Sequence, residues 1–133
     1  MLTLDLSQFT GSQTWTRHPL YPNTLLSEGV VHLANTAGAW WLAEAILSHI
    51  CYGKEIRREQ RKNEAFARLH FWYLEPKGNG AVLTARTDSE QPPVVSQRIG
   101  LTDFPFDEGE TFTLYCGDDG PNTPIKLFLP SEY

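Results

Sequence analysis

The sequence has few cysteines, no long hydrophobic run and no charged leader. The two cysteines, Cys51 and Cys116, form no Cys-x-x-Cys pair, so we interpret both as small buried apolar residues in a reducing compartment, with a disulfide as the less favoured alternative. The longest apolar-rich stretch, residues 37–51, is interrupted by polar residues and is too short to span a bilayer. No basic segment precedes an apolar run at the N-terminus, so we expect no signal peptide and a cytoplasmic protein.

Several catalytic and metal-binding motifs are also missing. The only Gly-Lys pair, Gly53-Lys54, follows an expected helix instead of opening one, which excludes a phosphate-binding loop there. No serine stands in a Gly-x-Ser-x-Gly elbow. The four histidines are never spaced two or four residues apart, so no local metal site is written in the chain. We therefore predict no cofactor and no metal.

What is present suits one small domain. The 133 residues are 41% hydrophobic and include four Trp, five Tyr and seven Phe, enough to fill a single core over residues 1–133. The net charge is −5, and residues 66–133 carry the whole excess, with five Lys/Arg against ten Asp/Glu. Taken over the chain, this charge argues against a non-specific nucleic-acid binder.

The first half of the chain predicts helices. Ser27 is placed as an N-cap, and apolar residues at helical spacing follow it as far as Ala37. A second helix, from about Ala39 to Tyr52, is apolar around most of its circumference and is expected to be central. The charged stretch 54–62 has only Ile56 as an apolar anchor, so it is either an exposed helical extension or a mobile linker.

After residue 64 the hydrophobic period changes from helical to alternating. We predict strands over residues 65–74, 81–87, 94–101, 111–116 and 125–129, with a hairpin turn at residues 77–80. The predicted fold class is therefore α+β: an N-terminal helical pair packed on one face of a five-stranded antiparallel meander.

Two carboxylates are candidates for acid–base catalysis. Glu44 lies in the most apolar segment, where burial would raise its pKa, although a wet helix stripe shared with Ser48 is the simpler interpretation. Asp103 precedes a Phe-Pro pair and is more simply read as an Asx-type turn at a strand end. An enzyme that uses Glu44, Asp103 or a histidine in a pocket is the alternative function.

Short blocks spread over the chain resemble a family of small uncharacterised bacterial proteins, a domain of unknown function carried on plasmids, phages and other mobile elements. The blocks are Phe9-Thr10-Gly11 with Trp15 and Arg17, Glu28-Gly29-Val30, Ala37-Gly38-Ala39-Trp40-Trp41-Leu42, Ile99 with Thr102-Asp103-Phe104-Pro105, and Leu129-Pro130-Ser131-Glu132-Tyr133. The resemblance implies a bacterial, cytoplasmic accessory protein. It carries over no activity and no site residue.

Strand alternation gives the main functional hypothesis. It assigns one apolar face, which includes Phe71 and Tyr73, to the helices and leaves a basic, aromatic outer face without a carboxylate. The predicted outer set is Arg68, His70, Trp72, Arg86, Arg98, Tyr115, Lys126 and Phe128.

Such a face has the parts for stacking planar groups and for pairing anions. We therefore expect a binding or interaction module rather than an enzyme. Its partner would be a second copy of the chain, an acidic protein, a phosphorylated ligand or single-stranded nucleic acid, and no membrane is implied. A face that is merely wet, or covered by the chain itself, stays open as the alternative.

Overall fold

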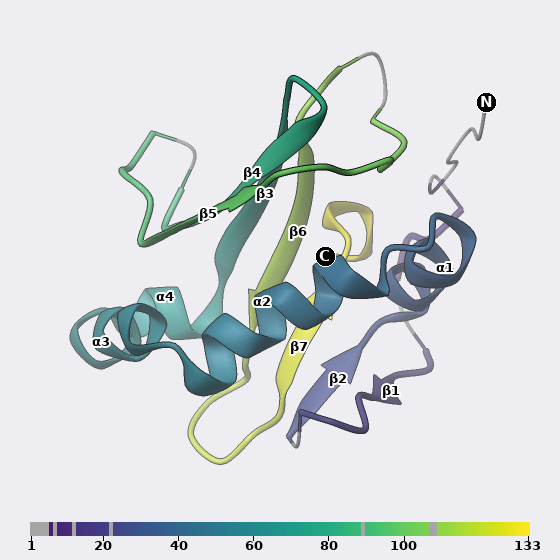
Figure 1. Cartoon of the computed structure of the whole chain (residues 1–133). Helices are drawn as coiled ribbons and strands as arrows, with labels where there is room; N and C mark the ends of the chain where they lie inside the picture. The colour runs from purple at the N-terminus through teal and green to yellow at the C-terminus, as the bar shows by residue number, and fades with distance from the viewer. Residues whose placement is uncertain (1–5, 7, 12, 22, 89, 107–108) are drawn as a thin grey trace.

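The structure is a computed structural model that describes residues 6, 8–11, 13–21, 23–88, 90–106 and 109–133. It is an α+β fold in which helices lie against one open mixed sheet (Figure 1). The helices are α1 (Glu28–Thr36), α2 (Trp40–Tyr52), α3 (Lys54–Lys62) and α4 (Glu64–Arg68), and a 3-10 turn follows at Pro130–Glu132. The strands are β1 (Thr16–Arg17), β2 (Thr24–Leu26), β3 (His70–Lys77), β4 (Gly80–Arg86), β5 (Val95–Ile99), β6 (Phe112–Gly117) and β7 (Ile125–Phe128).

The sheet order is β1-β2-β7-β6-β3-β4-β5. Every neighbouring pair is antiparallel except β2 and β7, which run parallel. The expectation of a five-stranded antiparallel meander is thus confirmed only as an α+β fold with a sheet. Two short N-terminal strands extend the sheet beyond β7, and a parallel pair between residues a hundred positions apart leaves no local signature in the sequence.

The first three helices lie where the sequence pattern predicts or allows helical segments. The Ser27 hydroxyl accepts a hydrogen bond from the Val30 backbone N–H at 3.2 Å, which caps α1 as predicted. The central helix spans Trp40–Tyr52, close to the predicted bounds, and buries its apolar residues against the sheet. The charged stretch 54–62 is the helix α3, with Ile56 as its one buried residue.

One predicted strand begins in the wrong place. Residues 64–68 form the short helix α4, whose first turn is capped by the side chain of Asn63. Its Phe66 is fully buried and stacks on the ring of His70 at 4.2 Å. The strand therefore begins only at His70, and the hairpin to β4 closes at the predicted turn, where Gly78 has a φ of +61°.

The side chains of β3 alternate between the helices and the opposite face of the sheet. His70, Trp72 and Leu74 are buried, and Trp72 stacks on His49 of α2 with ring centroids 5.7 Å apart. Phe71 and Tyr73 point to the opposite face. The assignment of His70 and Trp72 to the outer face is therefore wrong, as is the assignment of Phe71 and Tyr73 to the inner face. Because residues 71–73 are all aromatic, their sequence does not show which of them alternate toward the core.

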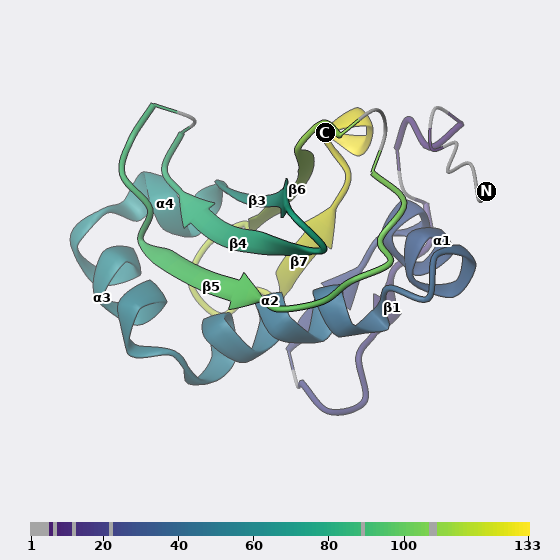
Figure 2. The same cartoon turned by 45° about the horizontal axis from the view of Figure 1, so that its top comes forward.

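The helices lie on the inner face, where the core sits (Figures 1 and 2). His49 of α2 also bonds Gln97 of β5 across 2.8 Å, which joins the helix to the far edge of the sheet. Gln97, an inward-facing polar residue, is thus paired. Both views place α1 and α3 at opposite ends of the molecule.

Candidate functional site

The outer side of the sheet carries a continuous row of aromatic rings that we call the aromatic face. It consists of Tyr73, Phe71, Tyr115, Phe128, Tyr133 and Trp15. The row crosses three adjacent strands because the register sets Phe71 opposite Tyr115 and Tyr115 opposite Phe128. Tyr73, Phe71, Tyr115 and Phe128 follow one another in contact, and both Tyr133 and Trp15 contact Phe128; the ring centroids of these pairs are 4.8 to 6.5 Å apart.

These rings are packed on one another yet only partly covered. Phe71, Tyr115 and Phe128 are half-buried, whereas Tyr133 is 78% exposed. Tyr133 lies parallel to Phe128, and most of the other contacts are edge-to-face. Single exposed apolar residues are common on any protein surface, whereas a contiguous apolar patch is typical of an interaction surface. The contacting rings on this open sheet face form such a patch.

The cations at one end of the face are matched by carboxylates. Lys126 Nζ lies 5.2 Å from the centroid of Trp15 and donates to Asp119 at 2.8 Å. Arg68 donates to Asp118 at 2.6 Å and to Glu64 at 3.1 Å. The local positive charge that the sequence suggested is therefore largely compensated.

Arg86 is held by the chain in the middle of the face. It lies opposite Phe71 and donates to the Gln91 carbonyl at 2.7 Å and to the Thr84 hydroxyl at 3.4 Å. Neighbouring Tyr73 has a raised pKa, mainly because it is partly buried, with Tyr115 adding to the effect and Arg86 opposing it. Glu75 follows Tyr73 on the same side of β3, so this face also carries a carboxylate, contrary to the prediction.

The predicted site residues thus separate into three groups. Arg86, Arg98, Tyr115, Lys126 and Phe128 lie on strands of the outer face, as expected. Arg68 ends α4 beside a pocket. His70 and Trp72 are enclosed in the core.

Sequence reasoning missed Phe71, Tyr73, Trp15 and Tyr133. The parity of β3 could have been found from its end, where Leu74 and exposed Glu75 show which side is wet. Trp15 and Tyr133 lie near opposite ends of the sequence, and no local pattern predicts that both contact Phe128.

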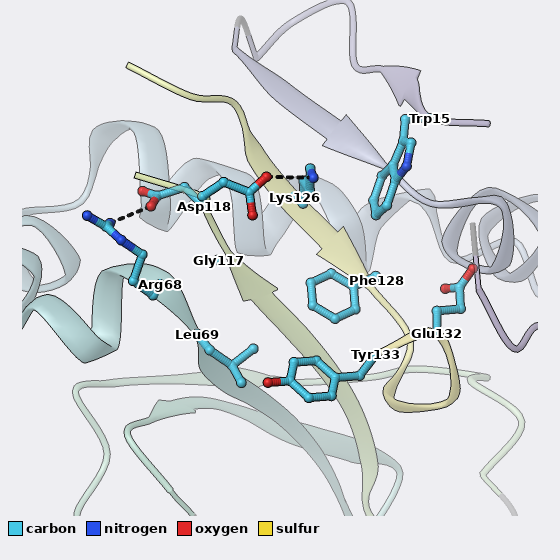
Figure 3. A pocket seen from close by; sticks show the side chains of 10 residues that line it. Trp15, Arg68, Leu69, Gly117, Asp118, Lys126, Phe128, Glu132 and Tyr133 are labelled. Atoms are coloured by element: carbon cyan, nitrogen blue, oxygen red, sulfur yellow. Dashed lines mark hydrogen bonds and ion pairs between the residues drawn. The ribbon is translucent and has the colours of Figure 1, made fainter. Parts of the chain in front are cut away.

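A pocket of about 520 Å³ opens at the end of the aromatic face (Figure 3). Trp15, Phe128, Tyr133 and Leu69 form its apolar walls, and the two ion pairs of Arg68 and Lys126 lie along its rim. The pocket therefore continues the aromatic face and combines apolar surface with balanced charges.

The C-terminal segment singled out in the sequence has a structural role. Glu132 accepts hydrogen bonds from the Ser27 hydroxyl at 2.5 Å, the Gly29 backbone N–H at 3.1 Å and the Leu129 N–H at 2.9 Å. A carboxylate at a helix N-terminus is favoured by the helix dipole. A Cβ on Gly29 would meet the Leu129 side chain and lie 2.8 Å from Glu132 Oε1, so a larger residue here would displace the side chains that hold the C-terminal segment. The segment ties β7 to the start of α1 and carries Tyr133 onto the aromatic face.

His70 is a core histidine. Its Nδ1–H donates to the Phe66 carbonyl at 3.1 Å, and its Nε2 accepts from the Trp72 indole N–H at 2.9 Å. These two bonds fix the neutral tautomer. Burial lowers the pKa of His70 from 6.5 to about 4, against a smaller opposing effect of the bond to Phe66.

The structure brings Glu44 next to a histidine. His18 Nε2 lies 3.2 Å from Glu44 Oε2, and His18 Nδ1 accepts the Leu20 backbone N–H at 3.1 Å. Both ring nitrogens are therefore engaged, and the pair fixes the segment before β2 onto α2. A general base would need one of those nitrogens turned to a substrate.

Asp103 is exposed, and the turn it was expected to form is made by its neighbour. The Thr102 hydroxyl accepts the Phe104 backbone N–H at 3.2 Å, so the Asx-type turn predicted at Asp103 is instead a threonine turn.

Among the described residues, no group of three or more His, Cys, Asp or Glu side chains lies close enough to hold a metal ion, and no helix is long and apolar enough to cross a membrane. Both cysteines are free, with Cys116 buried and Cys51 half-buried.

Fold and surface together define a small α+β protein with one helix-covered sheet face and one open aromatic face. The chain belongs to a family of unknown function, DUF6876, whose model matches residues 1–133. No curated protein and no solved structure matches it.

Proposed function

We propose that the protein is a non-enzymatic interaction module that docks through its aromatic face, and that the partner on this face is a second copy of the chain. The observation that supports this most is the continuous row of contacting, partly exposed rings on the side of the sheet away from the helices. Aromatic residues are enriched at the centre of protein–protein interfaces.

The charges around the row favour a second copy over a polyanion. Lys126 and Arg68 already form ion pairs with carboxylates of the same chain, and these carboxylates would weaken the attraction of the two cations for a phosphate. Exposed Arg98 and exposed Glu75 lie on the same face, on strands β5 and β3. A face that carries both signs can pair with itself across a two-fold axis.

Sedimentation over a range of protein concentrations tests the proposal. The wild type should approach twice the 15.1 kDa mass of one chain. Phe71→Arg puts a charge into the aromatic row, where a partner would have to bury it, and should give monomers. Tyr133→Glu should weaken the dimer in the same way. Because Tyr133 is 78% exposed, this substitution should have little effect on the stability of the monomer.

The control is Tyr52→Arg, at an aromatic residue of α2 that is 66% exposed and lies outside the aromatic face. It should leave the dimer intact. A wild type that stays monomeric at about 100 μM, or a Tyr133→Glu variant that dimerises like the wild type, would refute the proposal.

The bacterial origin, the link to mobile elements and the cytoplasmic location stay predictions.

A further inference from the structure

Helix α3 separates its charges by side. At about 100° per residue, its five cations occupy an arc of about 140° whose centre lies opposite Ile56. The cations are Lys54, Arg57, Arg58, Arg61 and Lys62, all of them exposed. Ile56 is fully buried, and the two carboxylates of the helix, Glu55 and Glu59, lie outside the arc. The helix is therefore anchored by its one apolar residue with a purely basic side turned outward.

This arrangement is not the one that stabilises a solvated helix. A surface helix gains stability when opposite charges are spaced three or four residues apart, and like charges at those spacings destabilise it. In α3 five pairs of cations have these spacings, Lys54–Arg57, Lys54–Arg58, Arg57–Arg61, Arg58–Arg61 and Arg58–Lys62, against two pairs of opposite charge, Glu55–Arg58 and Glu59–Lys62. The repulsion between these cations therefore lowers the stability of α3.

The chain leaves the centre of this basic side unpaired. Lys62 pairs with Glu59 at 3.6 Å, and Arg57 donates to the Cys51 carbonyl at the end of α2. Within the described part of the chain, no ion pair or hydrogen bond engages the side chains of Lys54, Arg58 or Arg61. These three residues lie at the middle of the arc.

We propose that the basic side of α3 binds the phosphodiester backbone of a nucleic acid. The arc contains no apolar or aromatic side chain, so it lacks the apolar centre that a protein partner would bury. A polyanion with regularly spaced charges needs no such centre, because the release of its counterions drives binding. The side is about 12 Å long and lies at one end of the molecule, away from α1 (Figures 1 and 2). The proposal is independent of the aromatic face.

Fluorescence anisotropy with a labelled duplex DNA, and with one of its strands alone, tests the proposal at several salt concentrations. The wild type should bind both with a dissociation constant of about 1–100 μM at low salt, and the affinity should fall as salt rises. The triple variant K54Q/R58Q/R61Q should lower the slope of log K against log salt by about two to three. Arg58→Gln alone should lower it by about one.

The matched control removes two exposed cations elsewhere, in the variant R17Q/K77Q, and is compared with the double variant R58Q/R61Q. It changes the net charge by the same amount and should keep most of the salt slope. Because glutamine is a good helix former and the substitutions relieve like-charge pairs, the α3 variant should unfold at the same or a higher temperature than the wild type.

Three results would overturn the proposal. The first is the absence of salt-dependent binding by the wild type to either form of DNA. The second is an equal loss of slope in the control variant, which would assign the effect to net charge. The third is salt-dependent binding of a labelled polyglutamate without binding of DNA, which would make the partner an acidic protein.

Discussion

The buried histidine predicts a loss of stability in mild acid. His70 has a pKa of about 4 in the folded protein, because burial opposes its charged form, against 6.5 when it is unfolded. Between these two values the unfolded chain binds the proton that the folded protein refuses. The contribution of His70 to stability is therefore complete above pH 6.5, falls as the pH drops toward 4, and changes no further below 4.

The size of the effect follows from the two pKa values. One pKa unit corresponds to about 1.4 kcal/mol, so the free energy of unfolding should fall by about 3 kcal/mol between pH 7 and pH 4. That is a large part of the ordinary 5–15 kcal/mol of a small domain. Protonation would also add a proton to Nε2, which now accepts the Trp72 indole N–H at 2.9 Å. The cost thus has a structural source in a specific bond.

Guanidinium unfolding, followed by tryptophan fluorescence at pH values between 4 and 8, measures this effect. His70→Asn keeps an amide donor for the Phe66 carbonyl but has no group that charges in this range. The variant should be less stable than the wild type at pH 7, and the difference should shrink by about 3 kcal/mol on going to pH 4. His32→Asn, on the surface of α1, is the reference for loss of a half-buried histidine. Parallel curves for the wild type and His70→Asn over the whole range would refute the reasoning.

Three further predictions concern stability and accessibility. Gly29→Ala should cost about 1–3 kcal/mol in unfolding free energy, because its Cβ would displace the side chains of Leu129 and Glu132, whereas Gly100→Ala meets nothing within 4 Å; equal effects in chemical denaturation would contradict this. Glu132→Ala removes three hydrogen bonds and should cost about 2 kcal/mol, with Glu132→Gln losing less; a thermal melt unchanged by the alanine substitution would show that the contact is not stabilising. In the native protein at pH 8 a thiol reagent should react with Cys51 and leave Cys116 intact, because complete burial raises the pKa of the Cys116 thiol further; two fast-reacting thiols before denaturant is added would count against the burial.

The sequence predicts most local structure because local signals decide it. Ser27 caps α1, and the apolar circumference of residues 39–52 gives α2. The signals for α4 were also local, since Asn63 can cap a helix and Glu64 suits its first turn, but the aromatic run beyond them suggested a longer strand. Pairing between strands far apart in the sequence leaves no local signal, so β2 and its parallel contact with β7 could not be found in this way.

The candidate surface was predicted in kind but not in detail. A run such as Phe71-Trp72-Tyr73 fits either face equally well, and only the buried partners of Trp72, which are Leu114 and Ala85, fix its orientation. The correction makes the outer face more aromatic and less basic, since Phe71 and Tyr73 replace His70 and Trp72. The ion pairs that neutralise Arg68 and Lys126 could not be predicted either, because Asp118 and Asp119 lie in a turn whose conformation places them beside these cations.

The acidic composition does not count against a nucleic-acid contact at α3. Net charge is summed over the whole chain, whereas a bound backbone responds mainly to charges within a Debye length, about 10 Å at 0.1 M salt. In α3, five cations against two carboxylates lie on nine residues, and α1 lies at the opposite end of the molecule in both views. Acidic surroundings would repel a polyanion from most of the surface and leave α3 as the favourable approach. The low isoelectric point therefore restricts where such a ligand binds, and it makes the contact weaker in absolute terms but more dependent on one helix.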